Sequence, residues 1–211
     1  MNETGSVKFK CEHLETELAP FPGFADLIES RQRLRDLGLL GVDENGIGFG
    51  NVSVRDGSSD AFFITGSGTG GLPALAIRDC AKVSAWDFDR NWLHCEGGTI
   101  ASAESLTHAA IYSMDRTVRI VLHFHSQSLW HTLLERAPAT RGDVAYGTPG
   151  MAREVQRLFR ETDVRKRKLF AMAGHEEGCV AFGRNGPEAL SVISAQLHPA
   201  LLPEKRNGAQ R

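Results

Sequence analysis

The segment SAESLTHAAIYSMDRTVRIVLHFH, from Ser102 to His125, constrains the fold more than any other part of the chain. Residues 103–114 are predicted to form a helix, and residues 117–125 a strand. Side chains alternate between the two faces of a strand. One face here is entirely apolar and is expected to meet the core: Val118, Ile120, Leu122 and Phe124. The other face is expected to carry Arg119, Val121, His123 and His125. The segment therefore predicts a strand that ends in two imidazoles.

Helices and short strands are predicted to alternate along the rest of the chain. The further helices are expected over 23–37, over 126–136, from Thr148-Pro149 onward, and from Pro187 to the residue before Pro199. The further strands are expected over 51–55, 61–65, 82–88, 92–95, 169–173 and 179–182. Threonine followed by proline is typical of a helix start, and Asp-Gly between two strands favours a hairpin. The mixture predicts an α/β domain whose sheet is at least partly antiparallel.

The composition favours one domain. The chain has 211 residues, of which 41% are hydrophobic, and this is enough for one substantial core. We expect a loosely ordered polar lead-in over residues 1–20, a single domain over residues 21–200, and a disordered tail over residues 201–211. The formal net charge of −2 does not indicate a nucleic acid or a membrane as partner. The basic run 165–168 is interpreted as a solvated surface loop.

The sequence predicts a cytoplasmic protein. No apolar run approaches the roughly 20 residues that a bilayer span requires. The polar N-terminus lacks the apolar segment of a signal peptide. The cysteines are scattered, without a C-x-x-C pair: Cys11, Cys80, Cys95 and Cys179. Free thiols in a reducing compartment fit this pattern better than disulfides do.

Histidines provide the strongest candidate for chemistry. His123 and His125, two residues apart at a strand end, can bind one metal ion or can be a hydrogen-bonded pair, and their spacing alone favours neither. His175 follows another apolar strand and a glycine, which places it at a sheet edge. Three imidazoles with one open position are typical of a catalytic zinc site. Imidazoles also bind other first-row divalent ions, so the metal is not decided.

Two further features each allow two interpretations. Glu104 falls in the first turn after Ser102, a candidate N-cap. Its carboxylate either interacts with the helix dipole, worth up to ~1 kcal/mol, or acts as an acid–base group beside the metal. The glycine-rich loops before residue 51 and at residues 66–71 are either tight turns or backbone N–H cradles for an anion.

Five motifs in order give a resemblance to a known family. They are GNVSVR (50–55), ITGSG (64–68), SAESLTHAAIY (102–112), VLHFHS (121–126) and GHEEGCVAFG (174–183). The chain resembles the class II aldolase/adducin family, a zinc-dependent group that includes fuculose-phosphate aldolase. The resemblance implies a three-layer α/β/α sandwich around a mainly antiparallel mixed sheet, and a homotetramer.

The resemblance also implies roles for individual residues. It implies that His123, His125 and His175 bind Zn²⁺, and that Glu104 is the acid–base residue, which can also touch the metal. The positions that hold a substrate phosphate in sugar-phosphate members match Gly50, Asn51, Ser67, Gly68 and Ser102.

The chain departs from the family pattern at two positions. Ala103 stands where the family usually has a second serine, and Glu176 stands where a glycine is common. The lost hydroxyl removes a hydrogen bond worth about 0.5–3 kcal/mol, which weakens phosphate binding without abolishing it. A non-phosphorylated or acidic substrate is therefore an alternative. Neither Tyr112 nor Tyr146 can be assigned from the sequence as a proton donor.

The function expected from this resemblance is that of a metal-dependent lyase. An aldolase of this kind cleaves or forms a C–C bond in a small hydroxy-carbonyl or sugar(-phosphate) substrate through a metal-stabilised enediolate. A dehydratase or an epimerase on the same site is an alternative, because these reactions share an enolate-type step. A non-catalytic, adducin-like binding domain is the alternative from another class.

Overall fold

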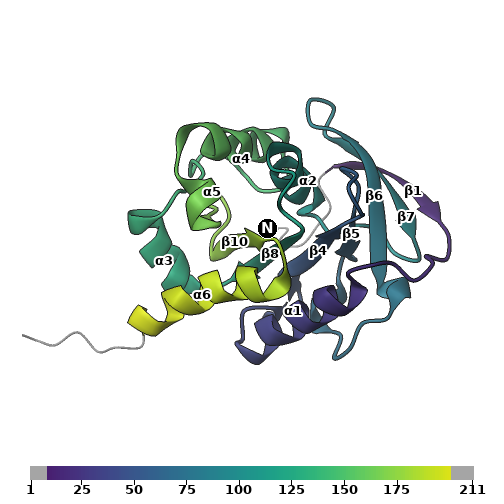
Figure 1. The fold of residues 1–211 in the computed structure, drawn as a ribbon, viewed down its shortest axis with the longest axis horizontal. Helices are drawn as coiled ribbons and strands as arrows, with labels where there is room; N and C mark the ends of the chain where they lie inside the picture. Colours follow the sequence, from purple (N-terminus) through teal and green to yellow (C-terminus); the bar gives the residue numbers. More distant parts are fainter. Residues whose placement is uncertain (1–8, 201–211) are drawn as a thin grey trace, which may run out of the picture.

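A computed structural model describes residues 9–200, in which one central sheet runs between two groups of helices (Figure 1). Two helices, α2 (Ser105–Met114) and α4 (Pro149–Glu161), cover one face of the sheet. Three helices cover the other face: α1 (Phe24–Asp36), α3 (Gln127–Arg136) and α6 (Gly186–Ala200). The predicted three-layer α/β/α sandwich is confirmed.

The central sheet has eight strands. Their spatial order is β1 (Lys10–Glu15), β7 (Trp92–Gly97), β6 (Cys80–Asp87), β5 (Phe62–Thr65), β4 (Asn51–Arg55), β8 (Ile120–His125), β10 (Gly178–Gly183) and β9 (Leu169–Ala171). Every neighbouring pair is antiparallel except β1 with β7, so the sheet is mainly antiparallel and mixed, as expected. The smaller elements are a hairpin of β2 (Gly41–Val42) and β3 (Gly48–Phe49), the 3-10 turns η1 (Thr69–Gly71) and η2 (Ile77–Asp79), and the short helix α5 (Val164–Arg167).

Strand β8 lies between β4 and β10 and separates two apolar clusters. The cluster beneath α1, α3 and α6 contains three of its side chains: Ile120, Leu122 and Phe124. Val121 packs into the other cluster, beneath α2 and α4. The predicted alternation therefore holds along the strand itself. Val118 is predicted to share the face of Ile120 but packs with Val121, because β8 begins at Ile120 and the alternation does not extend back to residue 118.

The ends of the chain differ from the prediction. Residues 10–15 are not a loose lead-in, because they form β1 and pair with β7 across all six positions. The last helix runs on to Ala200 instead of ending before Pro199. The tail expected over residues 201–211 lies outside the described residues. Within residues 9–200, no helix combines the length and the apolarity needed to cross a bilayer.

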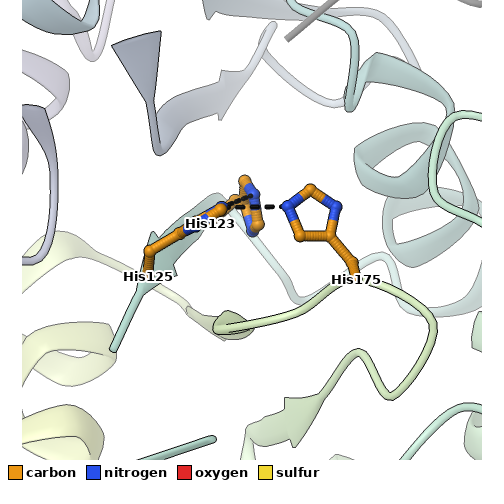
Figure 2. Close-up of side chains that lie close together, drawn as sticks. All are labelled: His123, His125 and His175. Carbon is orange, nitrogen blue, oxygen red and sulfur yellow. Dashed lines mark hydrogen bonds between the residues drawn. The ribbon is translucent and has the colours of Figure 1, made fainter. Parts of the chain in front are cut away.

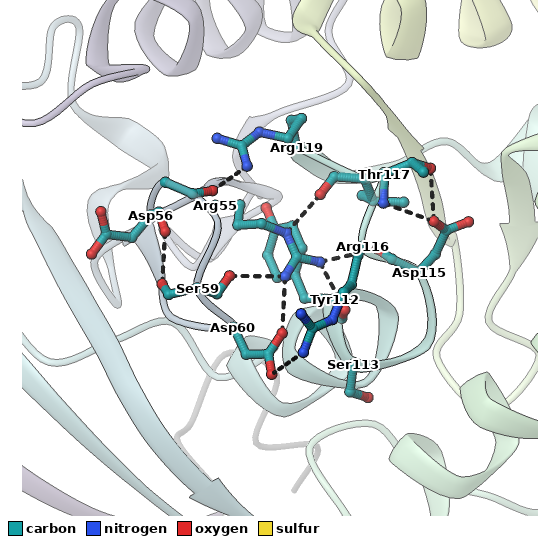
Figure 3. Close-up of polar contacts among 12 residues, drawn as sticks. Arg55, Asp56, Ser59, Asp60, Tyr112, Ser113, Asp115, Arg116, Thr117 and Arg119 are labelled. Carbon is teal, nitrogen blue, oxygen red and sulfur yellow. Dashed lines mark hydrogen bonds and ion pairs between the residues drawn. The ribbon is translucent and has the colours of Figure 1, made fainter.

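The C-terminal end of α2 is anchored to the sheet by Arg55 of β4 (Figure 3). Its guanidinium side chain is 1% exposed and lies 4.6 Å from the centre of the Tyr112 ring. It donates hydrogen bonds of 2.7–3.2 Å to five oxygens: the carbonyls of Ser59, Tyr112, Asp115 and Val118, and the carboxylate of Asp60. Because a helix leaves its last carbonyls without partners, this arginine supplies the missing donors.

Candidate metal centre

Three imidazole rings converge where β8 ends (Figure 2). His123 and His125 come from β8, and His175 comes from the turn between β9 and β10. The Nε2 atoms of His123 and His125 are 3.2 Å apart, and those of His125 and His175 are 3.0 Å apart. Ring nitrogens of all three residues lie within 4.8 Å of one another. The structure therefore brings together the three histidines that the sequence singled out.

Glycines on both sides of His175 allow its ring to enter the cluster. A Cβ at Gly174 would lie 1.8 Å from the carbonyl oxygen of Val144. A Cβ at Gly178 would lie 2.7 Å from Cδ2 of His175 itself. Real side chains do not approach so closely, so any larger residue would force the turn to move. The motif GHEEG is thus a steric requirement for the position of the third imidazole.

Burial keeps the strand imidazoles neutral. It lowers the pKa of His125 to about 3 and the pKa of His123 well below its usual value. Nδ1 of His123 lies 3.2 Å from the carbonyl oxygen of Cys179. An N–H on this nitrogen donates to that carbonyl and leaves the Nε2 lone pair directed at the other rings. Neutral imidazole is the form that binds metals.

Glu104 lies directly beside the three rings and is 3% exposed. It occupies the N-cap position of α2, so this helix begins at Ser105. Ser102, the candidate N-cap from the sequence, is therefore not the cap. The reason is a preceding turn, in which the backbone N–H of Ser105 donates to the carbonyl oxygen of Ser102. The hydroxyl of Thr107 donates to Oε2 of Glu104 at 2.7 Å.

The second carboxylate oxygen of Glu104, Oε1, lies 3.5 Å from Nδ1 of His175. This distance suits an ion pair better than a hydrogen bond, and within residues 9–200 neither atom has a hydrogen-bond partner. Burial by itself raises the pKa of Glu104. Contacts with His175, His123 and Thr107 together have the larger, opposite effect, so the pKa is lowered to about 2. Glu104 is therefore an ionised carboxylate at neutral pH.

The donor atoms fit a divalent cation. A proton on Nε2 of His125 can satisfy only one of its two contacts with the neighbouring rings, and a cation would satisfy all three rings at once. Metal–nitrogen bonds of 2.0–2.1 Å in a tetrahedral site place the nitrogens about 3.3–3.4 Å apart. The observed separations of 3.0 and 3.2 Å are close to that spacing. A buried carboxylate oxygen without a hydrogen-bond partner lies beside the cluster, as expected of a site built for positive charge.

The cluster opens into a cavity of about 400 Å³. The residues that the resemblance assigned to a substrate phosphate all line it: Gly50, Asn51, Ser67, Gly68 and Ser102. Ala103 and Glu176, the two departures from the family pattern, line it as well. Among the described residues no lysine or arginine does so. The cavity has the size of a site for a small molecule.

Two arginines hold the glycine-rich wall of the cavity from behind, and the sequence did not point to them. Arg31 of α1 is 3% exposed and donates to the carbonyl oxygens of Thr69, Gly70 and Leu72. Arg35 donates to Gly70 as well, at 2.8 Å. Burial lowers the pKa of Arg31 to about 10, which leaves it charged at neutral pH. Loop 66–72 is therefore ordered by charged donors outside the cavity.

Tyr146 was also not assigned from the sequence. It lines the cavity, and its ring centre lies 4.1 Å from that of His175. Tyr112 is fully buried in the core instead, where its hydroxyl bonds to Ser53 at 2.8 Å. No spacing rule relates residue 146 to the histidines, so the sequence could not distinguish the two tyrosines. Only their three-dimensional surroundings do so.

Solved structures resemble this fold. An L-fuculose 1-phosphate aldolase aligns with a TM-score of 0.63 and 19% identity, over 86% of this chain and 84% of its own. The enzyme of the same name from Thermus thermophilus aligns with a TM-score of 0.60 and 20% identity, over 84% and 90% of the two chains. YgbL from Klebsiella pneumoniae, described as a putative aldolase/epimerase/decarboxylase, aligns with a TM-score of 0.61 and 17% identity, over 88% and 90%. At such identities these similarities support the fold alone.

A family model provides the assignment. A comparison with curated protein sequences finds no significant match. The model of the class II aldolase and adducin N-terminal domain matches residues 32–196, which include the whole histidine cluster and Glu104. The match confirms the resemblance drawn from the five sequence motifs, and the chain belongs to the class II aldolase and adducin family.

Proposed function

We propose that this protein is a metal-dependent aldolase, which cleaves or forms a C–C bond in a small hydroxy-carbonyl compound. The observation that carries the proposal is the position of three clustered imidazoles and one ionised carboxylate, Glu104, at the wall of a small-molecule cavity. Two structural neighbours that share the fold bear the name of an aldolase, so the proposed reaction is one that proteins of this fold carry out. Family membership supports an enzyme but leaves the substrate undefined.

Each residue has a separate role in this proposal. His123, His125 and His175 hold a divalent cation, with Zn²⁺ as the first candidate. The cation supplies Lewis acidity for the negative charge that develops on substrate oxygens when the C–C bond breaks. Glu104 moves the proton, and Thr107 orients its carboxylate through the 2.7 Å hydrogen bond. Tyr146, across the His175 ring, is the candidate for a second proton transfer.

The substrate end remote from the bond to be broken is proposed to lie against Gly50, Asn51, Ser67, Gly68 and Ser102. Loop 66–72, held by Arg31 and Arg35, favours an acidic group there. Ala103, and a lining that contains no lysine or arginine of residues 9–200, weaken the binding of a dianionic phosphate. We therefore propose an unphosphorylated hydroxy-carbonyl compound or hydroxy acid as the first substrate class, and a sugar phosphate as the second.

Assembly and location complete the proposal. A homotetramer is proposed from the family, and a cytoplasmic location is supported by the four free cysteines. Epimerisation remains the second candidate activity, because a structural neighbour carries the description putative aldolase/epimerase/decarboxylase. Dehydration stays beside it only because it shares the enolate-type step. The two candidates require the same cation and the same proton-transfer residue.

Metal analysis of purified protein separates an enzyme from a non-catalytic binding domain. The native protein is expected to hold one divalent ion per chain, and His123→Ala to hold none. His131→Ala removes an exposed histidine of α3 and is the matched control, with native metal content expected. Equal metal content in all three proteins would refute the proposed site.

Turnover tests the role of Glu104. Glu104→Gln keeps the shape of the side chain, so it is expected to retain the ion on its three imidazoles and to lose activity by at least about 10²-fold. Native and variant proteins, loaded with Zn²⁺, would be screened against sugar phosphates and small hydroxy acids for aldehyde release. Full activity in Glu104→Gln would show that another group moves the proton.

A further inference from the structure

Two cysteines meet at the edge of the sheet farthest from β9. Cys11 lies on the edge strand β1, and Cys95 lies on its neighbour β7. Their Sγ atoms are 3.2 Å apart although the residues are 84 positions apart in the sequence. Cys95 is fully buried, and Cys11 is partly exposed at the sheet edge. Neither residue lines the cavity of the metal centre.

The geometry differs from that of the other thiols. Disulfide sulfurs are about 2.05 Å apart, so the two atoms need to approach by about 1 Å. Cys11 is paired with Leu93 and Cys95 with His13, so the cysteines lie diagonally across the ladder, and the approach involves a shift of the edge strand β1 as well as side-chain rotation. Cys80 and Cys179 are fully buried, have no thiol contact in residues 9–200, and burial raises the pKa of each to about 12. They are therefore the inert thiols of this chain.

The electrostatics of the pair support reactivity. The hydrogen bond from Cys11, together with the backbone of Ala101 and the nearby His13 and His94, lowers the pKa of Cys95 to about 6 against the effect of burial. The same shared proton raises the pKa of Cys11. Cys95 is therefore the sulfur of this pair that loses its proton more readily, with Cys11 as its hydrogen-bond donor.

We propose that Cys11 and Cys95 are a redox modification site, a dithiol that a hydroperoxide converts to a disulfide between β1 and β7. The Cys11 sulfur, which is the accessible one, attacks the peroxide while its proton passes to Cys95. An S–O bond forms, the O–O bond breaks, and hydroxide leaves. The Cys95 sulfur then attacks the sulfenic sulfur of Cys11, the S–S bond forms, the S–O bond breaks, and the oxygen leaves as water. The two sulfurs lose two electrons in total, and one peroxide becomes one water and one hydroxide, which takes a proton from the solvent to give the second water.

The consequence is a covalent tie on the edge strand. β1 pairs only with β7 in the described sheet, so its attachment depends on one ladder and on a 2.8 Å bond from His13 to the carbonyl of Gly97. A disulfide between positions this far apart restricts the unfolded chain strongly. The oxidised protein is expected to unfold at higher urea concentration, and its metal content is expected to stay unchanged because the pair lies outside the cavity.

Thiol counting and intact mass after hydrogen peroxide treatment test the inference. Alkylation under denaturing conditions is expected to find four thiols in the reduced native chain and two after oxidation, with a mass loss of about 2 Da for the two hydrogens. Peptide mapping should link residues 11 and 95, and a thiol reductant should restore four thiols. Cys11→Ser, at a partly exposed edge position, is expected to fold and to form no internal disulfide.

A matched variant makes the outcome decisive. Cys80→Ser removes one of the two inert thiols. After oxidation this variant should retain one free thiol, that of Cys179, and should still form the link between residues 11 and 95. Four thiols in the treated native chain would overturn the inference. A disulfide between two chains, or a mass gain of oxygen in place of the mass loss, would overturn it as well.

Discussion

Replacing Arg55 with methionine should reveal how much the anchor of α2 contributes to stability. The substitution keeps an apolar stem in place of the arginine and removes all five hydrogen bonds of the guanidinium group. Helix α2 starts directly after Glu104, so the same anchor holds the element that presents the proposed proton-transfer residue. Loss of the five hydrogen bonds is therefore expected to affect both the stability of the fold and the helix that follows Glu104.

The magnitude follows from the oxygens left behind. The carbonyls of Tyr112 and Val118 accept their bonds in buried surroundings, and each loses a partner at a cost of about 1–3 kcal/mol. The carbonyls of Ser59 and Asp115 are partly solvated, and Asp60 is 49% exposed, so water replaces much of what they lose. Removing the buried charge returns part of its desolvation cost. We expect a net loss of roughly 2–5 kcal/mol.

Urea unfolding followed by circular dichroism measures this loss. Arg153→Met is the matched control, because Arg153 is 60% exposed and pairs with the exposed Asp89. That variant should lie within about 0.5 kcal/mol of the native protein. A loss below about 1 kcal/mol for Arg55→Met would refute the claim that its donors are needed by the end of α2.

Three further predictions concern the turn before β10, the core beside the site and the response to acid. Gly174→Ala places a Cβ 1.8 Å from the carbonyl of Val144 and should lower both stability and bound metal, whereas at Gly142 the nearest atom is 3.9 Å away and the same change should leave metal content intact. Ser53→Ala removes the buried hydroxyl that lies 2.7 Å from His108 and 2.8 Å from Tyr112. Urea unfolding should show a loss of about 1–3 kcal/mol in the free energy of unfolding. The control Ser128→Ala, at an exposed position, should lose less than about 0.5 kcal/mol. The hydrogen bond from Arg157 lowers the pKa of the Glu154 carboxyl, so its contribution is present above the unfolded pKa of about 4.3 and is lost as pH falls through the lower folded value. Unfolding curves between neutral pH and pH 3 should therefore show a smaller acid-induced loss for Glu154→Gln than for the native chain, and parallel losses would contradict the assignment.

Local patterns were sufficient to predict most of the fold. The strand at Asn51–Arg55 and the helix at Pro149 were predictable because alternation and capping are properties of neighbouring residues. Strand β1 was not, because KCEHLE has little apolar alternation and becomes a strand only by pairing with β7, 82 positions further along. Ser102 was a candidate N-cap because serine favours that position, yet a local turn takes the place of the first helical residues. Strand pairing between residues far apart in the sequence and competition between turns cannot be predicted from a local pattern.

The candidate site divides in the same way. The spacing of His123 and His125 indicates a shared strand face, and the glycines around His175 indicate a tight turn. Tyr146 and Arg31 could not be found in this manner, because their roles arise from contacts with residues far away in the sequence. The residue pattern alone left the role of Glu104 open, and the resemblance to a family predicted that it lies beside the metal. In the structure its carboxylate lies 3.5 Å from Nδ1 of His175.

The charge of the cavity sharpens the question of the substrate. Four carboxylates line it, those of Asp43, Glu104, Glu176 and Glu177, and no lysine or arginine of residues 9–200 does. Asp43 is partly satisfied by the backbone N–H groups of Asn45 and Ile47, and a divalent cation on the imidazoles would offset two of the four charges. A dianionic phosphate would thus enter a lining that carries an excess of negative charge, and its hydrogen bonds would have to come from uncharged donors, among them the side chains of Asn51, Ser67 and Ser102 and backbone N–H groups of loop 66–72. Arg31 and Arg35 face the carbonyls of that loop and act across it, which is weaker than a direct ion pair. The balance favours a substrate with less negative charge than a phosphate monoester, and Ala103 in place of a second hydroxyl points in the same direction.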